Sequence, residues 1–412
     1  MSWWLWQTPA MSLLALNAGS SSIRFALFEA GTPPLRVCGG KLDRIGHPEA
    51  ALTVADSRST AMQAPADLDG TSFPSAVDSL LKWMESQRWF RSVEAVGHRV
   101  VHGMRHTAPQ RATHELLEEL KHIDLLDPEH LPQEIELVET LMQKFPALPQ
   151  ALCFDTAFHR DLPLRSRLLP IPRRYAAAGI RRYGFHGLSY TYLMQELERL
   201  HDRAAGRGRV ILAHLGSGAS LAAVRDGRCI DTTMGLTPTG GLMMGTRCGD
   251  LDPGVLLYLL DGERMDAAAL RRTLNHESGL LGISETSADV RDLLRREADD
   301  ARAAEAIELF CYRVRTAIAS FAGALGGVDT LVFAGGIGEN SPEIRARICE
   351  GLEFLGITLD EARNVRSAGV ISAGVGTGAA AVTVRVIRTD EESVIAQLAA
   401  GVLAIRSKGE TP

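Results

Sequence analysis

The sequence has few cysteines, and they are far apart. The chain has six, of which the two closest, Cys229 and Cys248, are 19 positions apart. This spacing excludes a CxxC metal-binding knuckle and the dense disulfide framework of a small secreted domain. The pattern is typical of a reducing compartment, so we expect a cytoplasmic protein.

An excess of positive charge is also absent. The 44 basic and 50 acidic residues among the 412 give a net charge of −6. Nucleic-acid-binding domains usually carry a basic excess, so we expect no nucleic acid as a partner. An anionic ligand must therefore be bound by a few local groups. The length corresponds to two or three domains of about 150 residues each.

Long hydrophobic runs are missing as well. The one unusual segment, Met1–Ala10 (MSWWLWQTPA), is too short to span a bilayer and lacks the positively charged start of a signal peptide. We therefore expect no membrane association, and Met11 is a candidate for the true start of the chain.

The usual nucleotide-binding motifs, Walker A and the dinucleotide fingerprint, do not occur. Instead, two segments read as strand, Gly/Ser-rich loop and strand: Leu13–Phe28 with the loop NAGSSS, and Val210–Val224 with HLGSGAS. A shift of 197 positions superimposes Asn17 on His214. Any hairpin turn favours Gly and Ser, but two such hairpins, one in each half, predict an internal duplication.

The remaining segments alternate between helical and strand patterns, which predicts sheets covered by helices. A proline-rich segment, Leu162–Pro172, is the expected boundary between the halves. We expect helices over Ser75–Arg88, Pro132–Lys144, Ser189–Leu200, Asp289–Arg296, Ala301–Leu325, Glu343–Phe354 and Glu391–Ala400, and strands over Val93–His98, Ala151–Phe154, Thr330–Ala334 and Thr383–Ile387.

A third glycine-rich segment, Phe333–Ser341 (FAGGIGENS), follows an expected strand. We expect a loop whose glycines expose backbone N–H groups to phosphate oxygens, and Ser341 followed by proline is a signal that a helix begins there. The loop Asp231–Pro253 is rich in Gly, Thr and Pro and carries Arg247, which is suited to an anion. The alternative for Arg247 is a solvated side chain beside methionines that fill the core.

Two histidine patterns have structural alternatives. His98, His102 and His106 would face one side of a helix as metal ligands, but the neighbouring valines and Gly103 favour a strand and turn. His186 in RYGFHG precedes an expected helix and reads equally well as a packed histidine.

Taken together, nine stretches resemble the acetate kinase family: LNAGSSS, GHRVVHG, FDTAFH, YGFHGLS, HLGSG, DTTMGLTPTGGLMMGTRCGD, ESGLLGIS, GGIGENS and RTDEE. The resemblance runs from about Met11 to Ala400. It implies an α/β fold of two duplicated actin-like (ribonuclease H-like) domains flanking a nucleotide cleft. The implied domains are 11–157 plus 388–404, and 158–387, the latter binding the nucleotide and forming a homodimer.

The resemblance also assigns roles residue by residue. It gives catalytic roles to Asp155, His186 and Arg247, and it places Mg²⁺ (or Mn²⁺) on Asn17 and Glu391. Arg99 would bind the acyl carboxylate, with Val101, Phe185 and Pro238 as the apolar acyl pocket. The implied nucleotide-binding residues are Arg24, His214, Leu215, Gly216, Ser217, Gly218, Asp289, Val290, Arg291, Gly336, Ile337, Gly338, Glu339 and Asn340.

The implied reaction is reversible, Mg²⁺-dependent phosphoryl transfer from ATP to acetate, giving acetyl phosphate and ADP. A carboxylate is ionised at pH 7 and attacks without a general base, so the site has to align it and neutralise phosphoryl charge. Asp155 is then an organiser of metal, water or arginine. The alternatives are a kinase of propionate or another short acid, a non-catalytic actin- or chaperone-type ATPase, and a degenerate homologue; Arg99, His186 and Arg247 favour the acyl kinases.

Four positions depart from the family pattern. Arg24 stands for the usual Lys, Ser217 for Asn, and Met104 for the second Gly of HGG. Glu129, in LDPEHLP, stands where an apolar pocket residue is usual. We expect the Glu129 carboxylate to turn away from the acyl methyl, into solvent or onto an arginine, and these departures affect acyl specificity more than phosphoryl chemistry.

Overall fold

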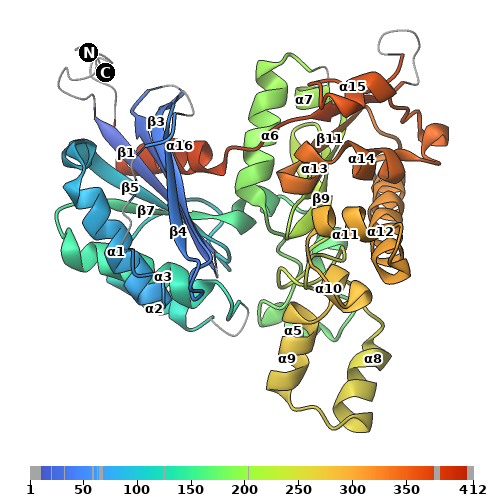
Figure 1. Cartoon of the computed structure of the whole chain (residues 1–412), viewed down its shortest axis with the longest axis horizontal. Coiled ribbons are helices and arrows are strands. Elements are labelled where there is room, and N and C mark those ends of the chain that lie inside the picture. The colour runs from blue at the N-terminus through green and yellow to red at the C-terminus, as the bar shows by residue number, and fades with distance from the viewer. Residues whose placement is uncertain are drawn as a thin grey trace. The chain divides into compact units, whose positions relative to one another are not determined.

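The structure is a computed structural model of the chain. It describes residues 11–405 except 20, 32, 58–59, 63, 65–67, 124–126, 203 and 375–380. Met1–Ala10 therefore lies outside the described residues. The chain divides into two compact units, Met1–Ala157 with Asp390–Pro412, and Phe158–Thr389 (Figure 1). Within the described ranges, none of the helices has both the length and the apolarity that a membrane crossing requires.

The first unit is built on a seven-stranded mixed sheet of order β4-β3-β2-β1-β5-β7-β6. β1 pairs parallel with β5, and β5 with β7, whereas the other pairs are antiparallel. All residues of β1 are buried, as expected of a central strand covered on both faces. The strands are Ser12–Ala18 (β1), Ser22–Glu29 (β2), Leu35–Asp43 (β3), Ala51–Asp56 (β4), Val93–Val100 (β5), Gln110–Arg111 (β6) and Gln150–Phe154 (β7).

Helices cover both faces of this sheet, as Figure 1 shows. Leu14, Leu16 and Val96 form a core with α1 and α3. The next residue of β5, Gly97, faces the opposite side and lies against α16. The helices of this unit are Phe73–Ser86 (α1), His114–Lys121 (α2), Leu131–Lys144 (α3) and Glu391–Leu403 (α16).

The second unit has a five-stranded mixed sheet of order β10-β9-β8-β11-β12. β8 pairs parallel with β11, and β11 with β12. The strands are Arg209–Leu215 (β8), Ala219–Arg225 (β9), Arg228–Thr232 (β10), Thr330–Ala334 (β11) and Thr383–Val386 (β12).

The helices of the second unit range from short turns to α12, which packs against β8 and β9. α12 begins where the Asp300 side chain accepts the N–H groups of Arg302 and Ala303, and it ends at Gly326 with φ +70°. The helices are Leu164–Arg167 (α4), Arg173–Ala177 (α5), Gly187–Arg199 (α6), Ala204–Arg207 (α7), Pro253–Leu257 (α8), Ala267–His276 (α9), Gly279–Ser284 (α10), Val290–Arg296 (α11), Ala301–Leu325 (α12), Gly335–Asn340 (α13), Pro342–Cys349 (α14) and Glu361–Val365 (α15).

The two sheets share one topology. The order β3-β2-β1-β5-β7 has the same pairing directions as β10-β9-β8-β11-β12, which confirms the expected duplicated α/β fold. The hairpins differ in length, because Asn17 pairs with Arg24 whereas His214 pairs with Ser220. The second loop is one residue shorter, so the shift of 197 holds for the first strand of each hairpin and fails for the second.

Two expectations about the glycine-rich segment and its helix were wrong. GGIGEN is the helix α13, because Gly335 at φ +77° turns the chain directly from β11 into a helical turn. The following helix, α14, ends at Cys349 and not at Phe354, because Glu350 leaves the helical conformation with ψ 126° and Gly351 has φ +79°. Ser341 precedes Pro342 as expected, but its side chain makes no capping hydrogen bond.

We predict that Gly97→Ala lowers the free energy of unfolding by about 1–3 kcal/mol, because the new methyl group would overpack the contact between β5 and α16. A Cβ at Gly97 would stand 2.6 Å from Ile395 Cγ2 and 2.9 Å from Ala399 Cβ. Gly401→Ala is the control: it lies in α16, and beyond the adjoining helix backbone no atom of the described residues is within 4 Å of the new Cβ, so we expect a gain of about 0.5–1 kcal/mol. Urea denaturation followed by circular dichroism measures both, and equal stabilities would contradict the packing argument.

Candidate active site

Four of the expected site residues come together in the first unit. Asn17 lies near the end of β1, Arg99 near the end of β5, and Asp155 directly after β7. Because β1, β5 and β7 run parallel, their carboxyl ends meet at one edge of the sheet. Glu391 begins α16, whose first turn is capped by Asp390. The helix thus brings Glu391 to Asn17 from 374 positions away in the sequence, and the Asn17 amide donates to Glu391 Oε2 over 2.9 Å.

Arg99 is the central cation of this cluster. Its Nη2 and Nε lie 2.6 and 3.0 Å from Asp155 Oδ2, and its Nη1 lies 3.4 Å from Asn17 Oδ1. The side chain of Arg99 is 15% exposed and that of Asp155 1%. Burial alone would lower the pKa of Arg99, but the carboxylates of Asp155 and Glu391 raise it. Arg99 is therefore always charged, and Asp155 fixes the direction of its guanidinium.

The donor set at Asn17 and Glu391 fits a hard divalent cation. Mg²⁺ binds proteins through one or two carboxylates and keeps several water or phosphate ligands. Burial raises the pKa of Glu391, although Arg99 opposes this shift. Burial thus destabilises the Glu391 carboxylate, and a bound cation would stabilise it. Among the described residues, no group of three or more His, Cys, Asp or Glu side chains is arranged to hold a metal by itself.

A buried acidic group beside Arg99 was not expected from the sequence. Glu134 on α3 is 2% exposed, and its Oε2 accepts the N–H of Val101 over 2.9 Å. Asp127 is also 2% exposed, and its Oδ1 lies 2.9 Å from His130 Nδ1. A sequence signal did exist, since Glu134 stands at helical spacing between the apolar residues Leu131 and Val138.

The second unit contains a pocket of about 880 Å³, a volume suited to a nucleotide-sized ligand. It is formed by the β8–β9 loop, the start of α11, and the junction of α13 with α14. Its lining includes eight of the expected nucleotide-binding residues: Gly216, Ser217, Asp289, Val290, Arg291, Gly336, Ile337 and Asn340. Ser341 and Pro342, which the sequence marked as a helix start, also line it, whereas the sequence did not indicate the remaining lining residues, Ala288, Leu294, Arg295 and Glu343.

The other expected nucleotide-binding residues are not part of the lining of this pocket. Leu215 and Gly338 are buried, and the Glu339 carboxylate accepts the N–H groups of Gly335 and Thr389. Glu339 therefore has a structural contact at the start of α13. Arg24 is exposed on β2 of the first unit, directly opposite Asn17.

A buried arginine of α14 forms a hydrogen bond with the backbone of α13. Arg345 is fully buried, and its Nη1 donates to the Gly338 carbonyl over 2.8 Å while its Nε donates to Asn364 Oδ1 over 2.9 Å. Burial lowers the pKa of Arg345 to about 10, so it is still a cation at neutral pH. The hydrogen bonds hold α13, α14 and α15 together next to the pocket.

His186 and Arg247 converge on Gly218. His186 precedes α6 in a left-handed conformation with φ +57°, which is strained for a residue with a side chain. Its Nδ1 lies 2.9 Å from Ser220 Oγ, and its ring stacks on that of His214 with centroids 4.2 Å apart. A Cβ on Gly218 would stand 3.3 Å from His186 Nε2 and 3.6 Å from Arg247 Nη1. One imidazole and one guanidinium thus meet beside the β8–β9 loop.

The expected acyl-pocket residues are all buried within their own units. Val101 follows β5 and is 2% exposed, and Phe185 is 1% exposed. The Pro238 carbonyl accepts Arg247 Nη1 over 3.1 Å, so Pro238 and Arg247 are held together. Glu129 is half-buried, and the expected direction of its side chain stays a prediction.

Met104 has a backbone conformation that would suit the glycine expected from the family pattern. Its φ is +48°, a left-handed conformation that a residue without a Cβ adopts at least cost. The three nearby histidines belong to the strand and turn favoured by the sequence, and His98 Nε2 lies 2.7 Å from Gln150 Oε1.

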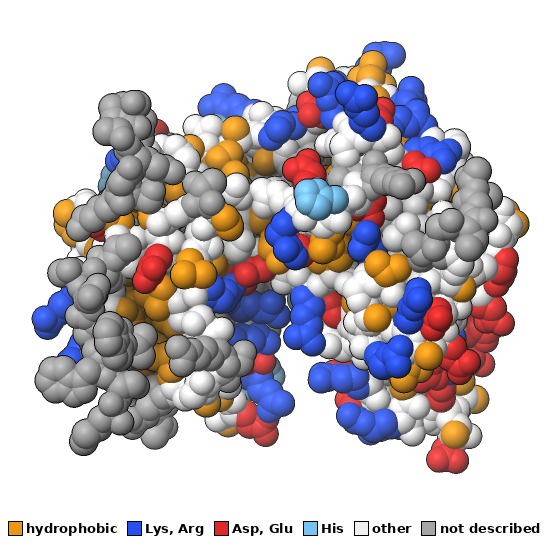
Figure 2. Space-filling model, turned by 90° about the horizontal axis from the view of Figure 1, so that it is seen from above, with side chains coloured by type: hydrophobic (Ala, Val, Ile, Leu, Met, Phe, Trp, Pro, Cys, Tyr) orange, Lys and Arg blue, Asp and Glu red, His pale blue; other side chains and the backbone are white. Residues whose placement is uncertain are grey.

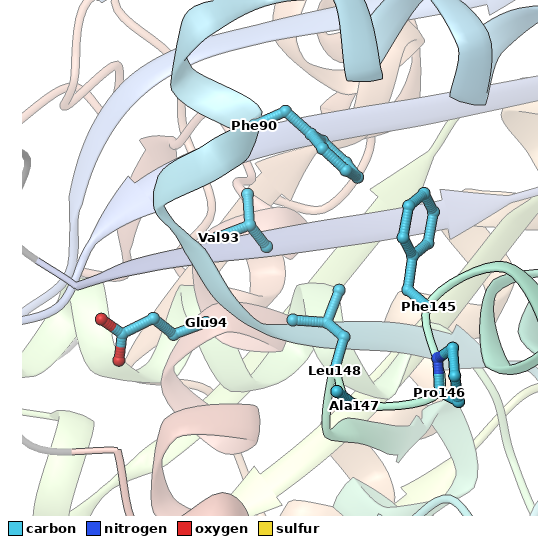
Figure 3. A pocket seen from close by; sticks show the side chains of 7 residues that line it. All are labelled: Phe90, Val93, Glu94, Phe145, Pro146, Ala147 and Leu148. Atoms are coloured by element: carbon cyan, nitrogen blue, oxygen red, sulfur yellow. The ribbon is translucent and has the colours of Figure 1, made fainter.

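A second hollow, of about 520 Å³, lies elsewhere in the first unit and contains none of the expected site residues. Figure 3 shows the rings of Phe90 and Phe145 near Val93 and Leu148, whereas the Glu94 carboxylate points away from them. This apolar lining has no group that would bind a phosphate. On the face shown in Figure 2, basic and acidic side chains are both exposed, and acidic ones gather along the right edge of the view.

Two α/β units of one topology, one with a nucleotide-sized pocket and one with a buried Arg–Asp–Glu cluster, define the class of duplicated actin-like phosphotransferases. The model of the acetokinase family matches residues 12–397. The chain belongs to the acetokinase family.

Individual proteins agree with this assignment. The chain is 46% identical over 391 residues to an acetate kinase of Rhodopseudomonas palustris, covering 93% of this chain and 96% of the relative. It is 41% identical to a propionate kinase of Citrobacter rodentium, covering 93% and 95%. The crystal structure of Porphyromonas gingivalis acetate kinase superimposes with a TM-score of 0.83 at 33% identity, covering 96% of this chain and all of that one. The predicted resemblance is confirmed.

Gly218→Ala should impair the chemistry more than the fold. Its φ lies outside the left-handed region, so the backbone tolerates alanine, but the methyl group would press on His186 Nε2 and Cε1 at 3.3 and 3.4 Å. We expect kcat to fall by about ten-fold or more, because a small displacement of a charge-stabilising group is costly. Gly323→Ala in α12 has no atom within 4 Å of its new Cβ and is the control. Steady-state kinetics and thermal melts compare them, and a normal kcat in Gly218→Ala would show that this contact is not needed.

Proposed function

We propose that this protein is an acetate kinase, which transfers the γ-phosphoryl group of ATP reversibly to the carboxylate of acetate. Membership of the acetokinase family over residues 12–397 carries this proposal. The geometry supports it, because a buried arginine suited to a carboxylate and a nucleotide-sized pocket stand on the two units of a duplicated fold. The first proposed domain is 11–157 with 388–404, and the second is 158–387.

In the proposed mechanism Arg99 binds the acyl carboxylate, and Asp155 holds the guanidinium in direction. The substrate carboxylate is already ionised and attacks the γ-phosphorus in line, so no residue has to remove a proton. His186 and Arg247 donate to the equatorial phosphoryl oxygens, where charge develops in the transition state. Glu391 and Asn17 would hold Mg²⁺, and the ion would supply positive charge for the phosphates. Val101, Phe185 and Pro238 surround the acyl methyl.

The nucleotide is assigned to the pocket of the second unit. Backbone N–H groups of the Gly216–Gly218 loop are suited to phosphate oxygens, and residues 289–291 and 336–340 are proposed to contact the rest of the nucleotide. A homodimer and a cytoplasmic location complete the proposal. Propionate kinase is the second candidate, because relatives and solved structures of both names match the chain over more than nine tenths of its length.

The direct test is formation of acyl phosphates. With ATP and Mg²⁺ we expect acetyl phosphate, trapped by hydroxylamine, and acetate should give the highest kcat/KM among formate, acetate, propionate and butyrate. Omission of the divalent ion should abolish the reaction. A folded protein that phosphorylates none of the four acids would overturn the proposed function, whereas a preference for propionate would select the second candidate.

Substitutions of Arg247 and of Arg99 should change different kinetic constants. Arg247→Ala should lower kcat by about 10²-fold or more with little change in ATP affinity, because its contacts strengthen in the transition state. Arg99→Ala should mainly raise the KM for acetate. Arg302→Ala, an exposed arginine outside both clusters, is the control. Equal and mild effects of both site variants would contradict this division.

A further inference from the structure

Glu134 ties α3 to the backbone beside the proposed acyl-binding residues. Its Oε2 accepts the Val101 N–H over 2.9 Å, and Val101 directly follows β5, which carries Arg99. Both Glu134 and Val101 are 2% exposed. A change at Glu134 would therefore move the backbone that places both the acyl-pocket wall and the carboxylate-binding arginine.

The other carboxyl oxygen, Glu134 Oε1, is buried and has no hydrogen-bond partner among the described groups. The same holds for Oδ2 of Asp127, whose Oδ1 lies 2.9 Å from His130 Nδ1. A buried carboxylate with an unsatisfied oxygen is costly, because it loses its hydration without replacement. As a carboxylic acid, with the proton on Oε1, Glu134 carries no charge and still accepts the Val101 N–H on Oε2.

The charges that face Glu134 do not compensate an additional anion. Arg99, on β5, is already paired with Asp155 at 2.6 Å. Asp127, from the segment before α3, and Asp155, from the segment after β7, are both negative neighbours. Burial raises the pKa of Glu134 well above its ordinary value; Arg99 and the Val101 N–H act against this shift, whereas Asp127 and Asp155 increase it. Burial and the two neighbouring acidic residues therefore favour the neutral acid form of Glu134.

We propose that Glu134 is a positioning residue for the acyl substrate, which as a neutral acid holds the Val101 backbone and keeps the surroundings of Arg99 free of a further negative charge. This inference rests on the proposed function. The substrate carboxylate is itself an anion, and in the proposed function it binds to Arg99. Ionised Glu134 would repel it, so substrate affinity is highest below the raised pKa of Glu134 and falls as the pH rises through it.

The test compares three variants with the wild-type full chain. Glu134→Gln keeps a neutral group with a carbonyl oxygen for the Val101 N–H, whereas Glu134→Leu removes the hydrogen bond. Glu136→Gln changes a half-buried glutamate of the same helix that lies outside the acyl cluster, and it is the matched control. KM for acetate, KM for ATP and kcat are measured between pH 6 and 10, together with thermal melts.

We expect the wild-type and Glu136→Gln acetate KM to rise at alkaline pH, by up to about ten-fold per pH unit above the pKa. In Glu134→Gln this rise should disappear, while the KM for ATP keeps its wild-type pH profile. Glu134→Leu should raise the acetate KM about ten-fold or more at every pH; if it does not fold, Glu134→Gln decides. An unchanged alkaline rise in Glu134→Gln would overturn the proposal.

A measurement independent of turnover separates this inference from the proposed function. Glutamate side chains labelled with ¹³C at the carboxyl give NMR signals that report protonation, and the signal absent from Glu134→Gln belongs to Glu134. We expect it to titrate well above the ordinary range, and to a higher pKa when acetate is added. A Glu134 signal that titrates near pH 4–5, or whose pKa does not change when acetate is added, would contradict the inference. Absence of acyl phosphate in every variant would instead reject the proposed function.

Discussion

The contact between α16 and Gly97 of β5 is the constraint on which the first unit depends. The central strands bury both faces, and only a residue without a side chain lets the helix approach so closely that Ile395 and Ala399 occupy the position of a Cβ. The approach brings the first turn of α16 to the carboxyl ends of β1 and β5. Arg36, on β3, holds that turn through Asp390 at 2.6 Å and Glu392 at 3.3 Å. The close packing thus places Glu391 next to Asn17, within the acidic cluster.

Electrostatic balance is the second principle of this cluster. Arg99 is surrounded by more carboxyl groups than one guanidinium can neutralise, and burial weakens the screening by water. The pKa values of Glu391 and Glu134 are raised by burial. If the proposed function holds, Mg²⁺ at Glu391 and a proton on Glu134 would both reduce the excess negative charge of this cluster.

The second unit has a sheet of the same topology, but this sheet positions a different set of side chains. Its β8–β9 loop is one residue shorter than the β1–β2 loop and consists of Gly216, Ser217 and Gly218. The absence of a Cβ at Gly218 leaves room for His186 and Arg247 to approach one point. Ser220 on β9 and the stacked His214 fix the His186 ring. A strained φ at His186 is tolerated because these neighbours hold the ring.

The sequence by itself determined the local elements and the family. Strand and helix periodicity predicted β1, β5, β7, β11 and α12 closely, because each is long or apolar enough for local pattern to decide. The glycine-rich and histidine-containing motifs identified the family, since their residue types are needed for chemistry.

Only the tertiary structure decided which of these residues meet. Nothing local links Glu134 to Val101, Arg345 to Gly338, or Glu391 to Asn17, because each pair is joined by packing between elements that are distant in the sequence or on separate helices and strands. The end of α14 at Cys349 and the helical turn of GGIGEN depended on positive φ angles at Gly351 and Gly335. Periodicity does not reveal these angles. The raised pKa values of buried carboxyl groups likewise follow from burial and neighbouring charges, which are properties of the folded chain alone.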